Sequence, residues 1–328
     1  MLKQITQPLW RKIQRNNFRS WEALVSFLEL DATHREKTLK QSHFPINIPQ
    51  RLAGKMKKNC IDDPILRQFL PLEDELKSEE GYSLDAVGDF AARKQGSSRL
   101  LHKYQDRALL IPTSACAMHC RYCFRQHYEY GAVDNIDKEL GIITNDSSIH
   151  EIILSGGDPL SWSHARLGEL IKALEEIPHL QRLRFHTRFP VGIPERIDEA
   201  FLDMIRQSRL QFWFVLHSNH PLELDQDVLH AMKLILCTGT PVLNQSVLLK
   251  GVNDCVDTLE ELIRKLVDHG IQPYYLHELD EIQGAMHFKV SRSNALKLME
   301  ELQKRLPGYG LPRYVKEEAG KSSKTIVF

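Results

Sequence analysis

From about residue 107 onward, hydrophobic and polar positions alternate in a repeating strand and helix pattern. Short apolar runs rich in β-branched and aromatic residues predict strands at 107–112, 151–155, 182–187, 211–217, 241–248 and 271–276. Amphipathic helical patterns separate these runs, for example at 166–176 and 258–269. A strand–helix repeat builds a parallel sheet with right-handed crossovers, so we expect an α/β fold whose six units form an open, partial (β/α)6 barrel.

The helix predicted at 258–269 has recognisable end signals. Asp257 stands where an N-cap is expected, Glu260 follows three residues later, and Gly270 is placed to end the helix. These signals fix the expected limits of one crossover helix.

The first hundred residues show helical pieces without a strand series. An apolar stripe at helical spacing follows Ser20 and consists of Trp21, Leu24, Val25 and Leu28. The proline-punctuated stretch at 44–71 predicts short helices joined by turns. We therefore expect a helical N-terminal cap at 1–100, followed by the partial barrel at 101–328.

Composition narrows the class of protein. With 328 residues, 42% of them hydrophobic, the chain can bury a large core. Lys plus Arg equals Asp plus Glu at 43 each, so no global charge favours nucleic acid or an acidic membrane as a partner. Residues 1–16 lack the apolar centre of a signal peptide, and no run of about 18 apolar residues occurs, so we expect a cytoplasmic protein.

Three of the six cysteines are crowded into one loop after the first predicted strand, namely Cys116, Cys120 and Cys123. The others, Cys60, Cys237 and Cys255, are scattered, which does not suit a disulfide framework. Three thiolates can hold three irons of a four-iron cluster and leave the fourth iron open to a small ligand. A structural zinc site completed by His119 or His127 is the alternative.

Further polar motifs fall at the carboxyl ends of the predicted strands, where ligands gather in parallel sheets. They are Ser155-Gly-Gly-Asp158-Pro, His186-Thr-Arg188, His217-Ser-Asn-His220-Pro, Asn244-Gln245-Ser246 and Asp280. Gly156 and Gly157 carry no Cβ, so their backbone can approach a ligand closely. Since Gly-Gly and Asp-Pro also occur in ordinary turns, a plain turn is the other interpretation of the first motif.

Together with the cysteine loop, these motifs resemble the lysine 2,3-aminomutases of the radical S-adenosylmethionine (SAM) superfamily. The resemblance spans about residues 100 to 325 and also includes His102-Lys-Tyr-Gln-Asp-Arg107 and Gly284-Ala-Met-His-Phe288. It implies three cofactors: a [4Fe-4S] cluster on Cys116, Cys120 and Cys123, SAM, and pyridoxal 5'-phosphate (PLP). Among these aminomutases, the chain is similar to the short members that lack a C-terminal extension and act in the modification of elongation factor P.

The resemblance also implies the residues that hold SAM and PLP. The SAM contacts would be Ser155, Gly156, Gly157, Asp158, His217 and Gln245. The phosphate of PLP would lie against Arg107 and Lys103, with Tyr104 packing nearby. Lys324, followed by Thr325, would form the Schiff base with PLP; the second candidate is Lys321. Ile326 stands where the family has proline.

The implied reaction moves the α-amino group of L-lysine to carbon 3 and converts (S)-α-lysine to (R)-β-lysine, which makes the protein an isomerase. Arg125 would hold the substrate carboxylate, and Asp280 and Glu317 would receive its ε-ammonium; the family has aspartate where Glu317 stands. A flavodoxin or ferredoxin type of protein would supply electrons. The product would serve elongation factor P through its (R)-β-lysine ligase.

Two other functions stay open at this point. A related aminomutase could act on arginine, whereas a glutamate enzyme is disfavoured because Asp280 and Glu317 would repel a carboxylate side chain. A non-enzymatic binding module stabilised by zinc on the three cysteines is the second alternative.

Overall fold

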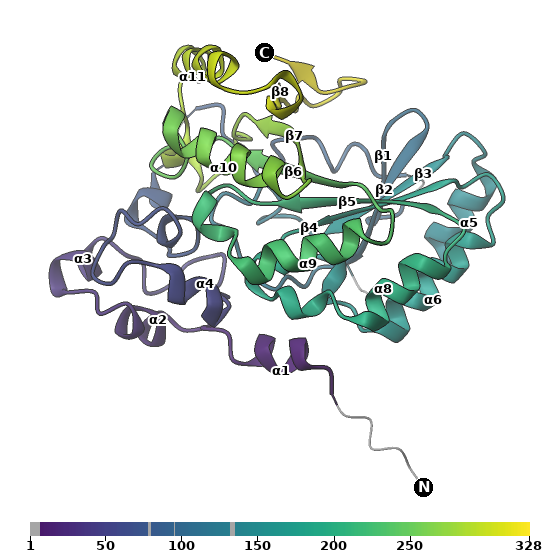
Figure 1. Ribbon diagram of the computed structural model, residues 1–328, viewed down its shortest axis with the longest axis horizontal. Coiled ribbons are helices and arrows are strands. Elements are labelled where there is room, and N and C mark those ends of the chain that lie inside the picture. The colour runs from purple at the N-terminus through teal and green to yellow at the C-terminus, as the bar shows by residue number, and fades with distance from the viewer. Residues whose placement is uncertain (1–6, 78–79, 95, 132–134) are drawn as a thin grey trace, which may run out of the picture.

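The computed structural model describes residues 7–77, 80–94, 96–131 and 135–328, which are built around one nine-stranded sheet (Figure 1). Its strands follow one another in chain order and are β1 (Leu100–Tyr104), β2 (Arg107–Thr113), β3 (Glu151–Gly156), β4 (Arg182–Thr187), β5 (Gln211–His217), β6 (Val242–Val247), β7 (Gln272–His277), β8 (Arg313–Lys316) and β9 (Thr325–Ile326). The strands from β2 to β8 pair in parallel, whereas β1 and β9 pair antiparallel with β2 and β8. In this linear order, β1 and β9 are the two edges of an open sheet.

Helices that connect the parallel strands pack along one face of the sheet, where α6, α8 and α9 lie side by side (Figure 1). The helices of this part are α5 (Asp137–Asn145), α6 (His164–Glu175), α7 (Phe189–Gly192), α8 (Glu199–Gln207), α9 (Gln226–Leu236), α10 (Val256–Asp268) and α11 (Arg292–Arg305). Short 3-10 helices are η3 (Pro159–Ser161), η4 (Pro194–Arg196), η5 (Pro221–Glu223), η6 (Met286–Phe288) and η7 (Gly308–Gly310). Alternation along β5 buries Phe212, Phe214 and Leu216 on one face and leaves His217 on the other. We call that second face the inner face.

The α/β partial barrel predicted from the hydrophobic pattern is confirmed, and the six predicted strands are β2 to β7. The structure extends the parallel series by β8 and adds the two antiparallel edge strands. The predicted N-cap at Asp257 is wrong, because α10 begins at Val256 and Cys255 occupies the cap position. Asp257 instead lies in the first turn, where its charge still favours the helix dipole. Gly270 adopts a positive φ of 74° just beyond the helix, as its predicted role requires.

The N-terminal segment contains α1 (Leu9–Arg15), α2 (Trp21–Phe27), α3 (Ala32–Glu36), α4 (Gln50–Lys55), η1 (Leu66–Gln68) and η2 (Glu73–Leu76). Its buried side chains, such as Trp10 and Leu24, belong to the same hydrophobic cluster as Phe185 and Phe201 of the barrel. Met118 of the cysteine loop also belongs to this cluster. The N-terminal segment is therefore packed directly against the loop that carries the three thiols.

A second hydrophobic cluster holds the C-terminal end of the chain. Tyr314 of β8 is buried there with side chains of α10 and α11. The backbone of Val327 donates a hydrogen bond of 2.8 Å to the carbonyl of Tyr314, and β9 pairs with β8. Lys324 directly precedes β9, so this pairing positions it. No helix in the described parts of the chain is both long and apolar enough to cross a membrane.

Candidate active site

The cysteine loop follows β2 and takes its shape from contacts with the N-terminal segment. The side-chain amide of Asn47 donates to the carbonyl of Cys116 at 3.1 Å, and that of Asn17 donates to the carbonyl of Ala117 at 2.8 Å. The two asparagines are also joined by a hydrogen bond of 2.8 Å and are both buried. Together they hold the backbone of the loop at Cys116 and Ala117.

Arg121 anchors the middle of the loop. Its side chain is only 1% exposed and forms an ion pair with Glu75, with Nε donating to Oε1 at 2.8 Å. It also donates to the carbonyl of Phe44 at 2.6 Å and to the hydroxyl of Ser42 at 2.7 Å. Each of these partners belongs to the N-terminal segment, so the backbone between the second and third thiols is fixed from outside the barrel.

The three thiols themselves are half-buried and free of disulfides. Burial raises the pKa of each, to about 11 for Cys123, so the metal-free loop is expected to hold them protonated. The guanidinium of Arg188 acts in the opposite direction at Cys120, because its Nη1 lies 3.1 Å from the Sγ. Cluster assembly would then release protons from the thiols.

The donor set fits an iron–sulfur cluster, since thiolate is the ligand that such clusters use. Among the described residues, no three or more His, Cys, Asp or Glu side chains converge closely enough for a single metal ion. A four-iron cluster does not require the three thiols to converge on one ion, because each thiolate binds a different iron. The two histidines considered for zinc have other partners: His119 contacts the carbonyl of Pro45 at 2.8 Å, and His127 lies 3.1 Å from a ring nitrogen of His43.

The glycine pair after β3 presses against the start of the cysteine loop. A Cβ on Gly157 would lie 2.5 Å from the carbonyl oxygen of Ala115 and 2.6 Å from the carbonyl carbon of Ser114. Gly156 has a φ of 110°, and a Cβ there would meet Ile111 at 2.4 Å. Both positions therefore require glycine for packing, whatever ligand approaches them.

Asp158 is a buried carboxylate that fastens the end of β3 to the end of β4. It accepts hydrogen bonds from the hydroxyl of Thr187 at 2.8 Å, from the backbone of Arg188 at 2.9 Å and from the backbone of Phe189 at 3.0 Å. It also caps η3 through the backbone of Leu160 at 3.1 Å. These contacts give Asp158 a direct part in placing Arg188 beside Cys120.

Arg125 lies in a buried charged group with two partners that sequence reasoning did not connect to it. Its Nε donates to Asp89 at 2.7 Å, and its Nη1 donates to the hydroxyl of Ser155 at 3.2 Å. Lys103 contacts the other oxygen of Asp89 at 2.7 Å and the carbonyl of Val87 at 2.7 Å. Although burial acts to raise it, the two cations hold the pKa of Asp89 below its usual value. Asp89 therefore orients Arg125 and Lys103 together.

Lys324 forms an ion pair with Glu317, whose other carboxylate oxygen accepts a hydrogen bond of 2.6 Å from the hydroxyl of Tyr104. The ammonium also lies 5.9 Å from the ring centre of Tyr275 on β7. Tyr104 thus does more than the packing expected of it. Lys321, the other candidate, is exposed.

Asp280 follows β7 and is half-buried close to the same charges. Burial raises its pKa to about 7, and the charge of Glu317 acts in the same direction. The ammonium groups of Lys324 and Lys103 partly offset this effect. Asp280 is therefore the carboxylate whose charge state would respond most directly to an additional cation in the site.

Three further predicted residues, His217, Gln245 and Arg107, lie on the inner face. In the sheet register His217 stands beside Gln245, and Gln245 beside Tyr275. The Nε2 atom of His217 is buried without a hydrogen-bond partner in the described structure, and burial lowers the pKa of this histidine to about 3. Arg107 begins β2 and its guanidinium lies 4.5 Å from the ring centre of Tyr104, so it reaches the side of the site that holds Lys324.

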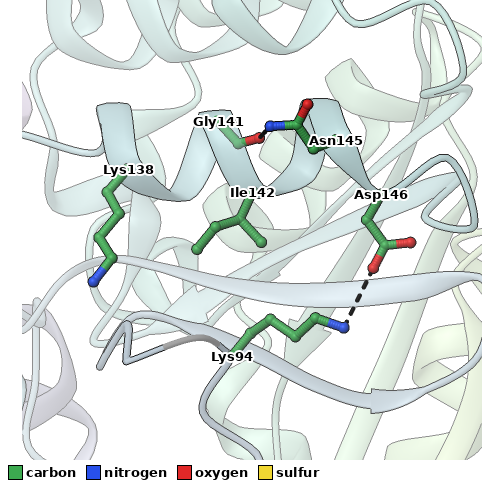
Figure 2. A pocket seen from close by; sticks show the side chains of 6 residues that line it. All are labelled: Lys94, Lys138, Gly141, Ile142, Asn145 and Asp146. Atoms are coloured by element: carbon green, nitrogen blue, oxygen red, sulfur yellow. Dashed lines mark hydrogen bonds and ion pairs between the residues drawn. The ribbon is translucent and has the colours of Figure 1, made fainter.

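Two residues, Asp89 and Arg188, were missed as parts of the site. Arg188 stood in a motif at the carboxyl end of β4, a position that could have indicated a role. Asp89 lies before the barrel and carries no comparable signal in the sequence. A surface pocket of about 360 Å³ lies between α5 and Lys94, which precedes β1. It is lined by Lys94, Lys138 and Asp146 among others and contains none of the predicted site residues (Figure 2).

Comparisons with known proteins show what the chain is similar to. A family model described as a 4Fe-4S single cluster domain matches residues 107–185, which include all three clustered cysteines. The chain is 40% identical over 322 residues to L-lysine 2,3-aminomutase from Haemophilus influenzae, with 97% of this chain and 95% of that protein covered. It is 41% identical over 312 residues to L-lysine 2,3-aminomutase from Escherichia coli, with 93% and 90% covered. A radical SAM methyltransferase structure from Sphaerobacter thermophilus aligns with a TM-score of 0.49 and 18% identity over 66% of this chain and 68% of that one.

An open parallel sheet with a three-thiol loop after its first parallel strand, matched by a 4Fe-4S domain model, places the chain among α/β proteins with a 4Fe-4S cluster domain. Within that class, the chain belongs to the lysine 2,3-aminomutase family. The cofactor set of this family is the one predicted from the sequence: a [4Fe-4S] cluster, SAM and PLP.

Proposed function

We propose that the protein is an L-lysine 2,3-aminomutase that converts (S)-α-lysine to (R)-β-lysine. One observation carries the proposal: β9 brings Lys324 to the inner face of a sheet whose first parallel strand leads into the three-thiol loop. A lysine suited to PLP and a thiol set suited to a cluster thus share one barrel.

Cys116, Cys120 and Cys123 would hold the cluster, and the inner face beside Ser155, His217 and Gln245 would receive SAM. When bound, the cluster and SAM supply a 5'-deoxyadenosyl radical, and PLP supplies an imine that can stabilise a neighbouring carbon radical. The protein's part is to orient these groups and to keep water away from them. The segments that follow β3 and β4 support that part, since Asp158 and Arg188 are both largely inaccessible to solvent.

Arg125 is proposed to bind the substrate carboxylate. Asp89 and Ser155 hold two of its three nitrogen atoms, which fixes the plane of the guanidinium before substrate arrives. Such an oriented guanidinium suits a planar carboxylate. Lys103 shares Asp89 with Arg125, so its proposed contact with the phosphate of PLP would depend on the same carboxylate.

Asp280 and Glu317 are proposed to bind the ε-ammonium of lysine. Glu317 already balances the charge of Lys324, and Tyr104 donates to its second oxygen. When Lys324 no longer carries an ammonium, Glu317 would be free to balance the charge of the substrate instead. Asp280 would ionise more readily near that cation, because an opposite charge lowers the pKa of a carboxyl.

We further propose that a flavodoxin or ferredoxin type of protein reduces the cluster. The proposed fate of the product is attachment to elongation factor P by its (R)-β-lysine ligase. This part of the proposal rests on the resemblance of the sequence motifs to aminomutases that act in the modification of elongation factor P, and it requires no direct contact between this chain and elongation factor P.

The test is anaerobic turnover by protein reconstituted with iron, sulfide, SAM and PLP. L-lysine, L-arginine and L-glutamate are supplied separately, and products are separated by chiral chromatography. We expect (R)-β-lysine from lysine alone. If arginine is converted in preference to lysine, the substrate is arginine instead. If the anaerobically purified protein contains zinc but no iron or sulfide, the zinc-stabilised binding module is favoured.

A further inference from the structure

A buried charged network lies directly behind the second cysteine. Arg188 is 6% exposed and directs its Nη1 toward the Sγ of Cys120 at 3.1 Å. The same nitrogen donates to the hydroxyl of Tyr122. An arginine placed this deeply is unusual, because a buried cation is costly unless it is paired and hydrogen-bonded.

The opposite side of the guanidinium is held by partners that are themselves inaccessible. Its Nη2 donates to Glu223 at 3.0 Å and to the side-chain oxygen of Gln68 at 2.7 Å, and both partners are 0% exposed. Gln68 also donates to Glu223 at 2.9 Å. Asn219 completes the group by donating to Gln68 at 3.0 Å and to the hydroxyl of Tyr122 at 2.7 Å.

Three separate parts of the chain therefore cooperate to direct one guanidinium at one thiol. Gln68 comes from the N-terminal segment, Arg188 from the end of β4, and Glu223 from the loop after β5. Asp158 fixes the backbone of Arg188 with a hydrogen bond of 2.9 Å. Such support limits the freedom of Arg188 to turn away from Cys120.

We propose that Arg188 is a positioning residue that sets the reduction potential of the cluster through a charge-assisted hydrogen bond to the Cys120 thiolate, and that Glu223 moderates this effect. Hydrogen bonds to cluster sulfurs and the net charge nearby are two of the factors that set such potentials. The inference rests on the proposed cluster.

The sign of each contribution follows from charge. Reduction adds one electron, taken from a low-potential one-electron donor, and lowers the charge of the cluster core from 2+ to 1+. The donated hydrogen bond stabilises the more negative, reduced form, so Arg188 makes the potential less negative. Glu223 places a negative charge behind the guanidinium and has the opposite effect. No proton is required, because Arg188 stays charged in both states.

The experiment measures the midpoint potential of the reconstituted full-length protein without SAM, by titration with reductant and detection of the paramagnetic reduced cluster. Arg188→Lys keeps the charge but loses the fork that reaches both the sulfur and Glu223, and its potential is expected to become more negative. Glu223→Gln removes the negative charge and is expected to shift the potential in the opposite direction. A tenfold change in the ratio of reduced to oxidised cluster corresponds to a shift of about 59 mV for one electron.

Arg196→Lys is the matched control, because Arg196 is also 0% exposed but is held by the carbonyl of Leu160 and by the rings of Trp10 and Phe201. Its potential should equal that of the unchanged protein. A more negative potential in Arg188→Lys together with a less negative potential in Glu223→Gln supports the proposal. Unshifted potentials, shifts of the same sign, or the two shifts in reversed directions would overturn it while leaving the proposed function intact. If the unchanged protein assembles no cluster, the proposed function fails as well.

Discussion

Gly157 illustrates how a single residue can support the cysteine loop without contacting a thiol. The backbone of Ser114 and Ala115 occupies the space that a Cβ would need. Backbone atoms cannot move aside as a flexible side chain can, so a methyl group here must displace the segment that leads to Cys116.

The first prediction concerns this position. Gly157→Ala should lower the iron and sulfide content after anaerobic reconstitution to less than half of the normal value. Gly141→Ala is the control, because Gly141 lies in α5 where a Cβ would meet no neighbouring atom within 4 Å, and alanine favours helix by about 1 kcal/mol. Equal cluster content in both variants would show that the loop tolerates the displacement.

A second prediction identifies the lysine that carries PLP. Reduction of the PLP-loaded protein with borohydride, followed by peptide mass spectrometry, should place the label on Lys324. Lys321→Ala should keep the label, since Lys321 is exposed, whereas Lys324→Ala should lose it. Label that disappears only in the Lys321 variant would assign the role to Lys321 instead.

A third prediction uses the protonation of Asp280. Its pKa of about 7 in the folded protein exceeds the ordinary value of 3.8, so between about pH 4 and pH 7 the folded state holds a proton that the unfolded state has released. Stability therefore falls as pH rises through this window, and Asp280→Asn should escape the loss. Relative to the unchanged protein, the variant should gain about 3 kcal/mol between pH 5 and pH 8, because the folded state holds the extra proton over about two pH units of this range and each unit is worth about 1.4 kcal/mol. Urea unfolding at both pH values measures this, and identical pH profiles would contradict it.

At the scale of elements, the N-terminal segment and the cysteine loop form a functional pair. Asn47 and Asn17 bind the loop backbone from one side, and Arg121 reaches back to Glu75 from the other. The loop is thus held by elements that precede it by many residues, so its geometry depends on tertiary packing.

This pairing gives the fourth prediction. Asn47→Ala removes the donor to the carbonyl of Cys116 and leaves buried groups unsatisfied, at a cost of about 1–3 kcal/mol. We expect lower cluster content as well as lower stability. Asn59→Ala is the control: Asn59 lies far from the thiols in sequence, has a positive φ of 48° and donates a surface hydrogen bond to Asp31. Its replacement should lower stability but leave the iron content normal. Proportional loss of iron in both variants would mean that stability alone explains the effect.

The strands that were predictable differ physically from those that were not. In a central parallel strand such as β5, side chains on both faces are buried, so the strand appears in the sequence as an apolar run, here Phe212 to Leu216. The edge strand β9 has only two residues, and β8 has two charged residues among its four. Short or charged strands of this kind leave little hydrophobic signal, so their pairing depends on the surrounding fold.

The same distinction applies to the site. The spacing of Cys116, Cys120 and Cys123 is local, and the chain itself displays it. The contact of Arg188 with Cys120 joins residues 68 positions apart, and Asp89 meets Arg125 across 36 positions. Such contacts arise only when the sheet and the N-terminal segment are assembled, so the sequence motifs could predict the ligands but not the network behind them.

At the scale of the whole molecule, the N-terminal segment and the barrel share one hydrophobic cluster, while the second cluster secures the C-terminal strands. The thiol loop depends on the first cluster and Lys324 on the second. The central claim is that the thiol loop and Lys324 act on the same substrate molecule. The amino group then moves from one carbon to the next within that molecule.

The most direct test supplies the reconstituted protein with L-lysine that carries both nitrogen-15 at the α-amino group and carbon-13 throughout its carbon skeleton, mixed with unlabelled lysine, in the presence of SAM and PLP without oxygen. The account predicts β-lysine in which the nitrogen-15 β-amino group and the carbon-13 skeleton stay together in the same molecules. Absence of β-lysine, β-lysine in which the two labels are scrambled between molecules, or transfer of nitrogen-15 to free ammonia would contradict it.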